Sequence, residues 1–306
     1  MDLQLDITKE MLNSIAEIDE FKGEWKVVRG NVSAKLEALR KEQTSNAYLD
    51  NEELASFTEA MDIVLSSYDQ VPLTEDHIKQ LHSLLFKHLH GDLKQRGQYK
   101  RQPDMFATPM ETASPFETPL KMQELMRWTT KQMESKEWHP IIVAAVFTAV
   151  FMTIHPFSDG NDRLAKILMT WILMKAGYTY IPFQPLKELL DFHKESYYSA
   201  LRRTRSSMNT EKVDWEQWIL FFLKIMKLQK DRLGQELSHE EEFGMELPDL
   251  SLQIVDLVKT HGRLSISRIR DLTEANRNTL KVHLRKLVEE KHLSKFGQGR
   301  GVWYGT

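Results

Sequence analysis

Apolar residues recur three and four positions apart along most of the chain, which is the spacing of one face of an α-helix. The pattern is clearest in four stretches, residues 36–61, 73–90, 118–135 and 213–233. Two further helices, at 141–154 and 163–178, are expected from longer apolar runs. No internal repeat or low-complexity tract interrupts the pattern. The sequence therefore predicts an all-α fold for most of the chain.

One segment breaks this helical periodicity. Residues 98–119 contain four prolines together with scattered serine and threonine. Proline cannot donate the backbone hydrogen bond that a helix interior requires, so the composition fits an extended loop or a short β-hairpin. On the residues alone, a plain surface loop and a hairpin are both open.

A short polar turn, HPFSDGND at 155–162, separates the two most apolar helices. The first helix is expected to end before Pro156, because the residue before a proline disfavours the α region. Gly160 permits a backbone angle that other residues avoid. The N-terminus of the following helix offers unpaired amide groups and a partial positive charge, which together favour an anion. The turn therefore predicts a phosphate site.

Charged and titratable side chains gather at the same turn. Arg163 lies in the first turn of the second helix, where its guanidinium can form a bidentate contact with phosphate. Asp159 is placed to hold Mg²⁺, which prefers one or two carboxylates plus phosphate oxygens. His155 is suited to act as a general base, because the pKa of a histidine side chain lies near working pH. His-Pro or Asp-Gly-Asn alone is usually a plain turn, but the combination indicates chemistry.

The nine residues HPFSDGNDR at 155–163 resemble the signature HPFx(D/E)GN(G/K)R of the Fic/Doc family. The resemblance extends over roughly residues 50–225. It includes GQYKR at 97–101, which looks like the segment that leads into the family's flap, and KESYYSALRR at 194–203. It implies a helical Fic core with a small β-hairpin flap at about 105–119, which would pair edge-on with an extended segment of a target.

The resemblance also implies an activity, protein adenylylation, in which AMP passes from ATP with Mg²⁺ to a Ser, Thr or Tyr hydroxyl of a target protein. In that interpretation His155 accepts the hydroxyl proton and Asp159 holds the Mg²⁺. The implied nucleotide-binding residues are Gly160, Asn161, Asp162 through its amide, Arg163 and Tyr198. The expected partner is a protein substrate with an accessible hydroxyl. Family members are often dimers, so a homodimer is also expected.

The chain departs from the family pattern at four positions: Asp162, Lys166, Thr148 and Arg205. Asp162 replaces the second glycine of GNGR, and Lys166 stands where a second arginine is common. Two like charges about 4 Å apart repel by at most about 4 kcal/mol at an effective dielectric near 20. Three outcomes are therefore open for Asp162. Its carboxylate points to solvent, or it becomes a second metal ligand, or it cripples the use of ATP and leaves a weak enzyme or one with a different nucleotide preference.

A second departure concerns inhibition. Many family members carry an inhibitory motif (S/T)xxxE(G/N), and NAYLDN at 46–51 aligns with it imperfectly, inside a predicted inhibitory helix near 44–55. Asp50 takes the position of the glutamate and would face Lys166, whose point charge replaces a planar guanidinium. We predict a weakened Asp50–Lys166 lock. The alternative is a surface aspartate without a regulatory role.

The C-terminal residues form a segment of different character. They predict helices at 251–262, 265–273 and 276–293, followed by a glycine-containing hairpin at 293–306. This order resembles a winged helix-turn-helix domain. Residues 251–306 carry eleven Lys and Arg against five Asp and Glu, a net charge of +6, so the rest of a chain whose total is −3 carries −9.

This basic charge favours binding to DNA. Arg277, Asn278, Lys281 and Arg285 lie on the first half of the third predicted helix, and Arg300 lies at the tip of the predicted wing. They are the residues expected to contact bases and phosphates. Winged helices also recognise proteins or dimerise, and both alternatives are open.

Composition sets the remaining limits. The 306-residue chain is divided into a helical segment (1–95), a catalytic core (96–234), an acidic linker (235–249) and a winged-helix domain (250–306).

Cysteine is absent, which excludes disulfides and thiolate metal sites and fits a reducing cytoplasm. The acidic N-terminus does not resemble a signal peptide, and the apolar run at 141–154 is too short to span a bilayer. We therefore expect a cytoplasmic protein without membrane contact.

A group of histidines, His82, His88 and His90, raises the question of a metal site. The spacing of His88 and His90 places their rings on different faces of a helix, so a solvated or capped helix end is expected instead. For the whole chain the leading interpretation is a protein adenylyltransferase. The alternative is a catalytically weakened nucleotide-binding signalling or regulatory protein with a DNA- or protein-binding winged helix. Transfer of another phosphate-containing group is a third interpretation.

Overall fold

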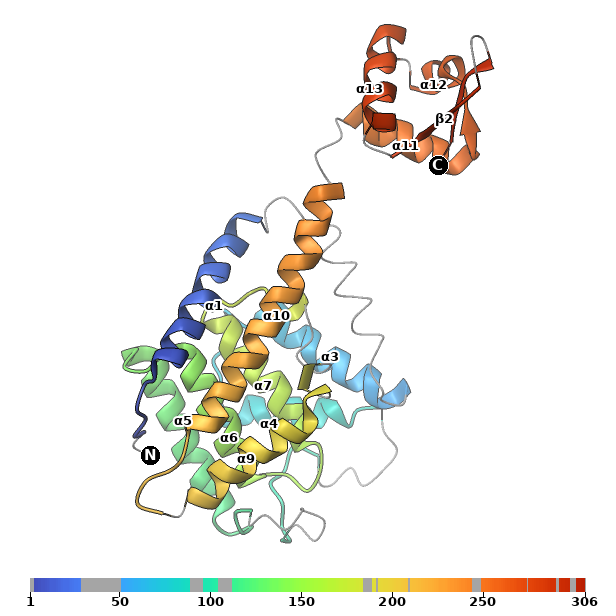
Figure 1. Ribbon diagram of the computed structural model, residues 1–306. Helices are drawn as coiled ribbons and strands as arrows, with labels where there is room; N and C mark the ends of the chain where they lie inside the picture. Colours follow the sequence, from blue (N-terminus) through green and yellow to red (C-terminus); the bar gives the residue numbers. More distant parts are fainter. Residues whose placement is uncertain are drawn as a thin grey trace. The chain divides into compact units, whose positions relative to one another are not determined.

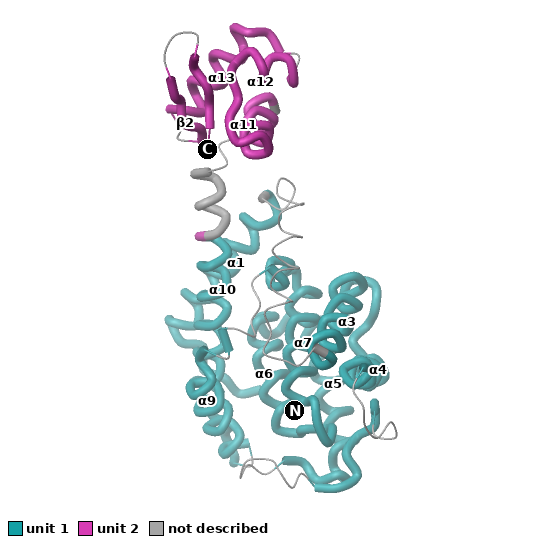
Figure 2. Tube along the Cα trace, turned by 90° about the vertical axis from the view of Figure 1, so that its right-hand side faces the viewer, with its two compact units in different colours: residues 1–234 teal, residues 235–306 magenta. Residues whose placement is uncertain are grey.

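The computed structural model describes residues 3–28, 51–88, 96–103, 112–183, 189–190, 192–208, 210–243, 249–273, 275–289, 292–297 and 301–305. The chain divides into two compact units, Met1–Gly234 and Gln235–Thr306 (Figure 2). The structure is mostly helical, as the periodicity predicts, and includes a small three-stranded sheet.

The helices of the first unit follow one another along the chain in Figure 1. They are α1 (Lys9–Val28), α3 (Asn51–Ser67), α4 (Glu75–Leu85), α5 (Thr118–Ser135), α6 (Pro140–Ile154), α7 (Asn161–Lys175), the short 3₁₀ helix η2 (Ile181–Phe183), α9 (Lys194–Ser207) and α10 (Glu216–Phe243). Helix α10 continues through residues 235–243, so the segment predicted as a linker begins as helix.

Two predicted features lie wholly or partly outside the described residues. Residues 36–50 of the expected first helix, with Asp50, are outside them, and the rest of that prediction belongs to α3. Residues 105–111 of the predicted flap are also outside them. The flap's C-terminal part, 112–117, is irregular and ends in a turn, and residues 118–119 already belong to α5.

Helix α6 lies at the centre of the first unit and packs against α5 and α7. Its residues from Ile141 to Ala149 are all buried, which is expected of a helix that is apolar on every side. Pro140 occupies its first turn, where a missing backbone N–H costs nothing. The indole of Trp218 on α10 donates to the backbone carbonyl of Ala145 at 2.7 Å, which satisfies a polar atom deep in this core. The α6–α7 pair thus forms a rigid base for the turn between them.

The second unit contains three helices and the sheet. Its elements are α11 (Asp249–His261), β1 (Arg263–Leu264), α12 (Ile266–Thr273), α13 (Arg277–Glu289), β2 (Ser294–Phe296) and β3 (Trp303–Gly305). The strands are antiparallel in the order β1-β3-β2. Its core joins one face of each helix, with Ile254, Ile269, Leu280 and Leu284 all fully buried. The three predicted helices and the hairpin are therefore present, and β1 is an additional strand that the periodicity did not indicate.

None of the helices in the described parts of the chain is both long enough and apolar enough to cross a membrane.

Candidate active site

The turn between α6 and α7 starts with an unusual backbone conformation at His155. Helix α6 ends at Ile154, and His155 follows with φ 51° and ψ 63°, in the left-handed region. Residues other than glycine seldom adopt this conformation, and it is often found where function requires it. The amide of His155 still donates to the carbonyl of Phe151 at 2.9 Å, so the helix ends abruptly rather than fraying. The side chain of His155 is half-buried at the first position of the turn.

Asn161 closes the turn from its other end. Its side-chain oxygen accepts a hydrogen bond from the amide of Phe157 at 3.0 Å, and its side-chain nitrogen donates to the carbonyl of Phe157 at 2.7 Å. The residue is only 2% exposed. Both polar atoms of the side chain thus make hydrogen bonds that close the turn, while the backbone amide of Asn161 lies in the first turn of α7, where an anion can accept from it.

Gly160 is required on two counts. Its φ is +75°, and a Cβ at this position would lie 2.8 Å from Cε2 of Phe86. Its carbonyl accepts the first hydrogen bond of α7, from the amide of Leu164 at 2.9 Å. The amides of the first turn of α7 have no intrahelical acceptor, and the cap residue supplies no side-chain acceptor. Together with the positive end of the helix dipole, these amides favour an anion, so this helix end has the features on which the predicted phosphate site depends.

Asp159 is exposed at this helix end. Its Oδ1 accepts a hydrogen bond from the amide of Gly160 at 2.5 Å. Within the described residues no group of three or more His, Asp or Glu could hold a metal alone. A lone carboxylate fits Mg²⁺ when phosphate oxygens complete the coordination, and Asp159 lies beside the helix end that is predicted to bind phosphate.

His82 contradicts the expectation of a solvated or capped helix end, because it is 4% exposed and belongs to the site. Its Nε2 lies 3.1 Å from the carbonyl oxygen of Asp159, and its Nδ1 accepts from the amide of Gly97 at 3.0 Å. The ring stacks on Phe157 with centroids 3.9 Å apart. Burial lowers the pKa of His82 to about 4, so the imidazole is neutral near pH 7. The sequence signal that could have identified His82 as buried is its position on the apolar face of α4, next to Leu81 and four residues after Ile78.

Arg163 is engaged by a carboxylate of another helix. Its Nη1 lies 2.9 Å from Oε1 of Glu53, which stands in the first turn of α3. The guanidinium also lies over the ring of Phe86, 5.2 Å from its centroid, and the side chain is only 14% exposed. Arg163, the predicted phosphate clamp, thus lies in the first turn of α7 and is paired with Glu53. Glu53 is a partner that no local sequence pattern indicated.

Asp162, whose carboxylate departs from the family pattern, pairs with Lys166 along α7. The two charged groups are 2.8 Å apart and four residues apart on the helix. The side chain of Asp162 is 46% exposed, whereas that of Lys166 is 15% exposed. The negative charge of Asp162 is thus compensated by Lys166 of the same helix. Because Asp50 lies outside the described residues, the predicted Asp50–Lys166 pair stays a prediction.

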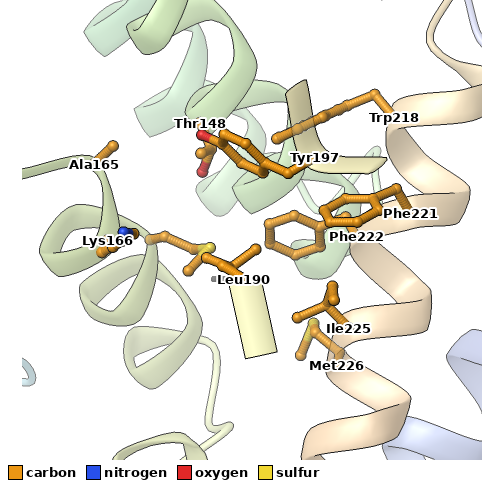
Figure 3. A pocket seen from close by; sticks show the side chains of 11 residues that line it. Thr148, Ala165, Lys166, Leu190, Tyr197, Trp218, Phe221, Phe222, Ile225 and Met226 are labelled. Carbon is orange, nitrogen blue, oxygen red and sulfur yellow. The ribbon is translucent and has the colours of Figure 1, made fainter. Parts of the chain in front are cut away.

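Tyr198 lies on α9 with its ring edge-on to Tyr197, 5.1 Å between centroids. Tyr197 lines an apolar pocket together with Thr148 of α6 and the stem of Lys166 of α7 (Figure 3). The hydroxyl of Thr148 donates to the carbonyl of Ala144 at 2.8 Å within its own helix. Two of the four departures from the family pattern, Thr148 and Lys166, therefore meet at this pocket.

Lys100, within the GQYKR segment, supports the turn from outside the two helices. Its amide donates to the carbonyl of Pro156 at 2.9 Å. Its ammonium donates to the carbonyl of Ile154 and to the hydroxyl of Thr112, both at 3.2 Å. The residue is 3% exposed. A buried cation at the C-terminal end of α6 is favoured by the helix dipole, and here it holds the segments on both sides of the predicted flap against the turn.

The central part of the chain matches a known protein family. Residues 72–173 match the Fic/DOC family. Two curated relatives are each described as protein adenylyltransferase Fic. The one from Nematostella vectensis is 28% identical over 158 residues, which cover 50% of this chain and 36% of the relative. The one from Drosophila melanogaster is 30% identical over 148 residues, which cover 47% of this chain and 29% of the relative. The chain thus spans about a third of the length of these relatives.

Solved structures show the same fold. A Fic family protein from Desulfovibrio desulfuricans matches with a TM-score of 0.69 and 19% identity, covering 100% of this chain and 98% of that one. A Fic-domain signalling protein from Bacteroides thetaiotaomicron matches with a TM-score of 0.51 and 19% identity, covering 72% of this chain and 97% of that one. An IbpAFic2 variant in complex with adenylylated Cdc42 matches with a TM-score of 0.50 and 17% identity, covering 73% of this chain and 72% of that one.

Proposed function

We propose that this chain is a protein adenylyltransferase that moves AMP from ATP to a Ser, Thr or Tyr hydroxyl of a target protein. The match of residues 72–173 to the Fic/DOC family supports the proposal. One observation carries the proposal. A half-buried histidine, His155, starts the short turn that leads into a helix N-terminus with unpaired amides and Arg163 in its first turn. The curated relatives' description and a similar fold that holds adenylylated Cdc42 support a protein substrate.

The proposed reaction needs a proton acceptor and a holder of phosphate charge. The hydroxyl oxygen of the target attacks the α-phosphorus of ATP, and the bond from that phosphorus to the bridging oxygen breaks, so that pyrophosphate leaves. His155 accepts the hydroxyl proton as the new bond forms. The amides of Asn161 to Arg163 bind the phosphate oxygens at the start of α7 and stabilise their negative charge. Mg²⁺ would neutralise phosphate charge when bound, and Asp159 is the residue that would hold it.

Both cations of the predicted site are paired with carboxylates of the chain. Glu53 holds Arg163, and Asp162 holds Lys166. We propose that Arg163 contacts the outer phosphates only after it leaves Glu53, so that the described state has a low basal activity. This pairing also favours the second candidate function, a nucleotide-binding regulatory protein with weakened catalysis.

Incubation with ATP labelled at either the α- or the γ-phosphate separates these functions. The reactions contain Mg²⁺ and the chain, either alone or with a protein extract that supplies acceptor hydroxyls. Label in protein from α-labelled ATP alone means adenylylation. Label from γ-labelled ATP alone means phosphorylation. Nucleotide binding without label in either reaction means the regulatory function and refutes the transferase.

The effect of Asp162 can be tested by its substitution with asparagine. We expect Asp162→Asn to tighten the binding of Mg-ATP by less than about tenfold, because a half-exposed ion pair with Lys166 is worth about 1 kcal/mol or less. Calorimetric titration of both proteins measures the change. A carboxylate that faced the phosphates would instead repel them by up to about 4 kcal/mol, and its removal would tighten binding by about a thousandfold. Such a gain would show that Asp162 disables the site.

For the second unit we propose a winged helix that binds duplex DNA through α13. Arg277, Asn278 and Lys281 are exposed on this helix, whereas Leu280 and Leu284 on its opposite face are buried. Arg285 is exposed as well and pairs with Glu289, while Arg300 lies outside the described residues. An exposed apolar side chain, Val282 at 68%, favours the alternative of protein recognition. A homodimer and a cytoplasmic location stay predictions.

Salt dependence distinguishes DNA from a protein partner. We expect the full chain to bind a labelled duplex with an affinity that falls as salt rises, because phosphate contacts release counterions. Replacing Arg277 and Lys281 together by alanine should reduce the slope of log affinity against log salt by about two. Lys259→Ala removes a single positive charge from exposed α11, half the change of the double variant, and serves as the control. Absence of binding at about 50 mM salt, where such contacts are strong, would exclude DNA.

A further inference from the structure

We infer that His82 is a positioning residue for the proposed transfer: its imidazole fixes the peptide between Asp159 and Gly160, and ties this peptide to the segment that leads into the flap. The inference rests on the proposed function. It concerns a side chain that touches neither the proposed substrate nor the proposed metal.

The contacts of His82 involve three parts of the chain. The ring stands on α4, donates to the carbonyl of Asp159 in the turn, and accepts from the amide of Gly97. Its faces are also covered, since the ring stacks on Phe157 with an interplanar angle of 11° and lies 4.9 Å from Phe86 between centroids. A side chain held in this way has one orientation available to it.

The hydrogen bonds determine which nitrogen carries the hydrogen. An amide can only donate, so Nδ1 of His82 must offer its lone pair to the amide of Gly97. A carbonyl oxygen can only accept, so Nε2 must carry the hydrogen that points to Asp159. Both polar atoms of the ring are thereby satisfied, and neither is left for a ligand.

The peptide between Asp159 and Gly160 is held from both of its ends. His82 donates to the carbonyl of Asp159, and the amide of Gly160 donates to Oδ1 of the Asp159 side chain. Because the peptide is planar, the direction of its carbonyl sets the direction of its N–H. The bond from His82 therefore also orients the Asp159 carboxylate, the proposed metal ligand, and the amides at the start of α7.

Through its second hydrogen bond, from the amide of Gly97, His82 also holds the segment before the predicted flap. Gly97 has φ +69° and packs so closely on α4 that a Cβ would lie 2.4 Å from Oγ of Ser83. Three residues later the amide of Lys100 donates to the carbonyl of Pro156. Residues 97–100 are thus joined to the turn twice, once through His82 and once directly. Displacement at either place would shift the turn relative to the segment that leads to the proposed target-binding flap.

Two substitutions separate positioning from simple support of the fold. His82→Phe keeps an aromatic ring for stacking on Phe157 but removes both hydrogen bonds. His82→Gln keeps a donor and an acceptor in a smaller side chain. We expect His82→Phe to lower kcat for AMP transfer by about 10- to 100-fold, which is the usual effect of losing an outer partner of a site, and His82→Gln to recover part of that loss. His88→Phe makes the same change at an exposed histidine after α4 and should leave kcat unchanged.

Amide hydrogen exchange supplies a readout that does not depend on transfer. In His82→Phe the amides of Gly97 and Gly160 should exchange faster, while those in the middle of α4 and α6 keep their protection. Faster exchange throughout α4 would mean that His82 only supports the fold, and an unchanged kcat together with unchanged exchange would overturn the inference. If the wild-type protein transfers no AMP, the proposed function fails; the exchange at Gly97 and Gly160 and the affinity for Mg-ATP then decide the role of His82.

Discussion

His155→Ala should lower the rate of AMP transfer by about 10²- to 10⁴-fold, because general-base catalysis by a positioned side chain typically contributes that much. Binding of Mg-ATP should change by less than about threefold, since the phosphates are held by the amides of α7, Arg163 and the proposed metal rather than by the imidazole. The measurement is incorporation of label from α-labelled ATP, together with a binding titration of the same protein. A loss of AMP transfer without a loss of Mg-ATP binding would identify His155 as a proton acceptor.

The control for this prediction is an alanine substitution at a histidine away from the site. His88 is exposed and pairs with Glu59, so His88→Ala should retain wild-type transfer. Equal melting temperatures of wild type and both variants would show that the fold is intact. Full activity of His155→Ala would remove His155 from the mechanism, and loss of Mg-ATP binding in that variant would assign it to binding instead.

Glu53→Gln should tighten the binding of Mg-ATP by about tenfold to a hundredfold and raise AMP transfer in the same direction. The reason is the 2.9 Å contact that occupies Arg163 in the described state. Once Glu53 is neutral, the guanidinium can turn to the outer phosphates, and a hydrogen bond between charged groups is worth about 1.5–3 kcal/mol. Glutamine retains the size of the side chain, so packing between α3 and α7 should be preserved.

Glu52 offers a matched control for this change. It precedes Glu53 in the first turn of α3 and is exposed. Glu52→Gln removes the same charge from the same helix end and should leave Mg-ATP binding within about twofold. Equal effects of the two substitutions would indicate a general charge effect. An unchanged or weaker affinity in Glu53→Gln would mean that Glu53 does not restrain the clamp.

Much of the fold could be predicted from local patterns. The apolar run of α6 and the proline at each end fix that helix and the turn after it, because burial and proline geometry are both readable along the chain. Gly160 was recognised for its backbone freedom, and its φ of +75° confirms the reason. The Fic/Doc resemblance, carried by residues 155–163, is confirmed by the family match over 72–173.

The pairs around the turn were harder to predict, for physical reasons that differ. Asp162 and Lys166 are four residues apart on a predicted helix, and opposite charges at that spacing meet, so their pair could have been identified from the sequence. Glu53 and Arg163 come from helices far apart in the chain, and only the packing of α3 on α7 brings them together. No local pattern contains that information.

His82 and strand β1 are two further features that the sequence alone could not predict. His82 lies on the apolar face of α4, but a histidine at such a position is equally compatible with a core residue and with a helix end. Its partners, Asp159 and Gly97, become visible only in the folded chain. Strand β1 is two residues long and exists because it pairs with β3 about forty residues later, so its short sequence carries no periodicity of its own.

A crystal structure with Mg²⁺ and a non-hydrolysable ATP analogue tests the central claim most directly. The account predicts phosphate oxygens within hydrogen-bond distance of the amides at the start of α7, the metal beside Asp159, and His155 next to the α-phosphate. It also predicts that Arg163 has moved from Glu53 to the outer phosphates. Phosphates bound elsewhere, or an α7 N-terminus closed by the carboxylate of Asp162, would contradict it.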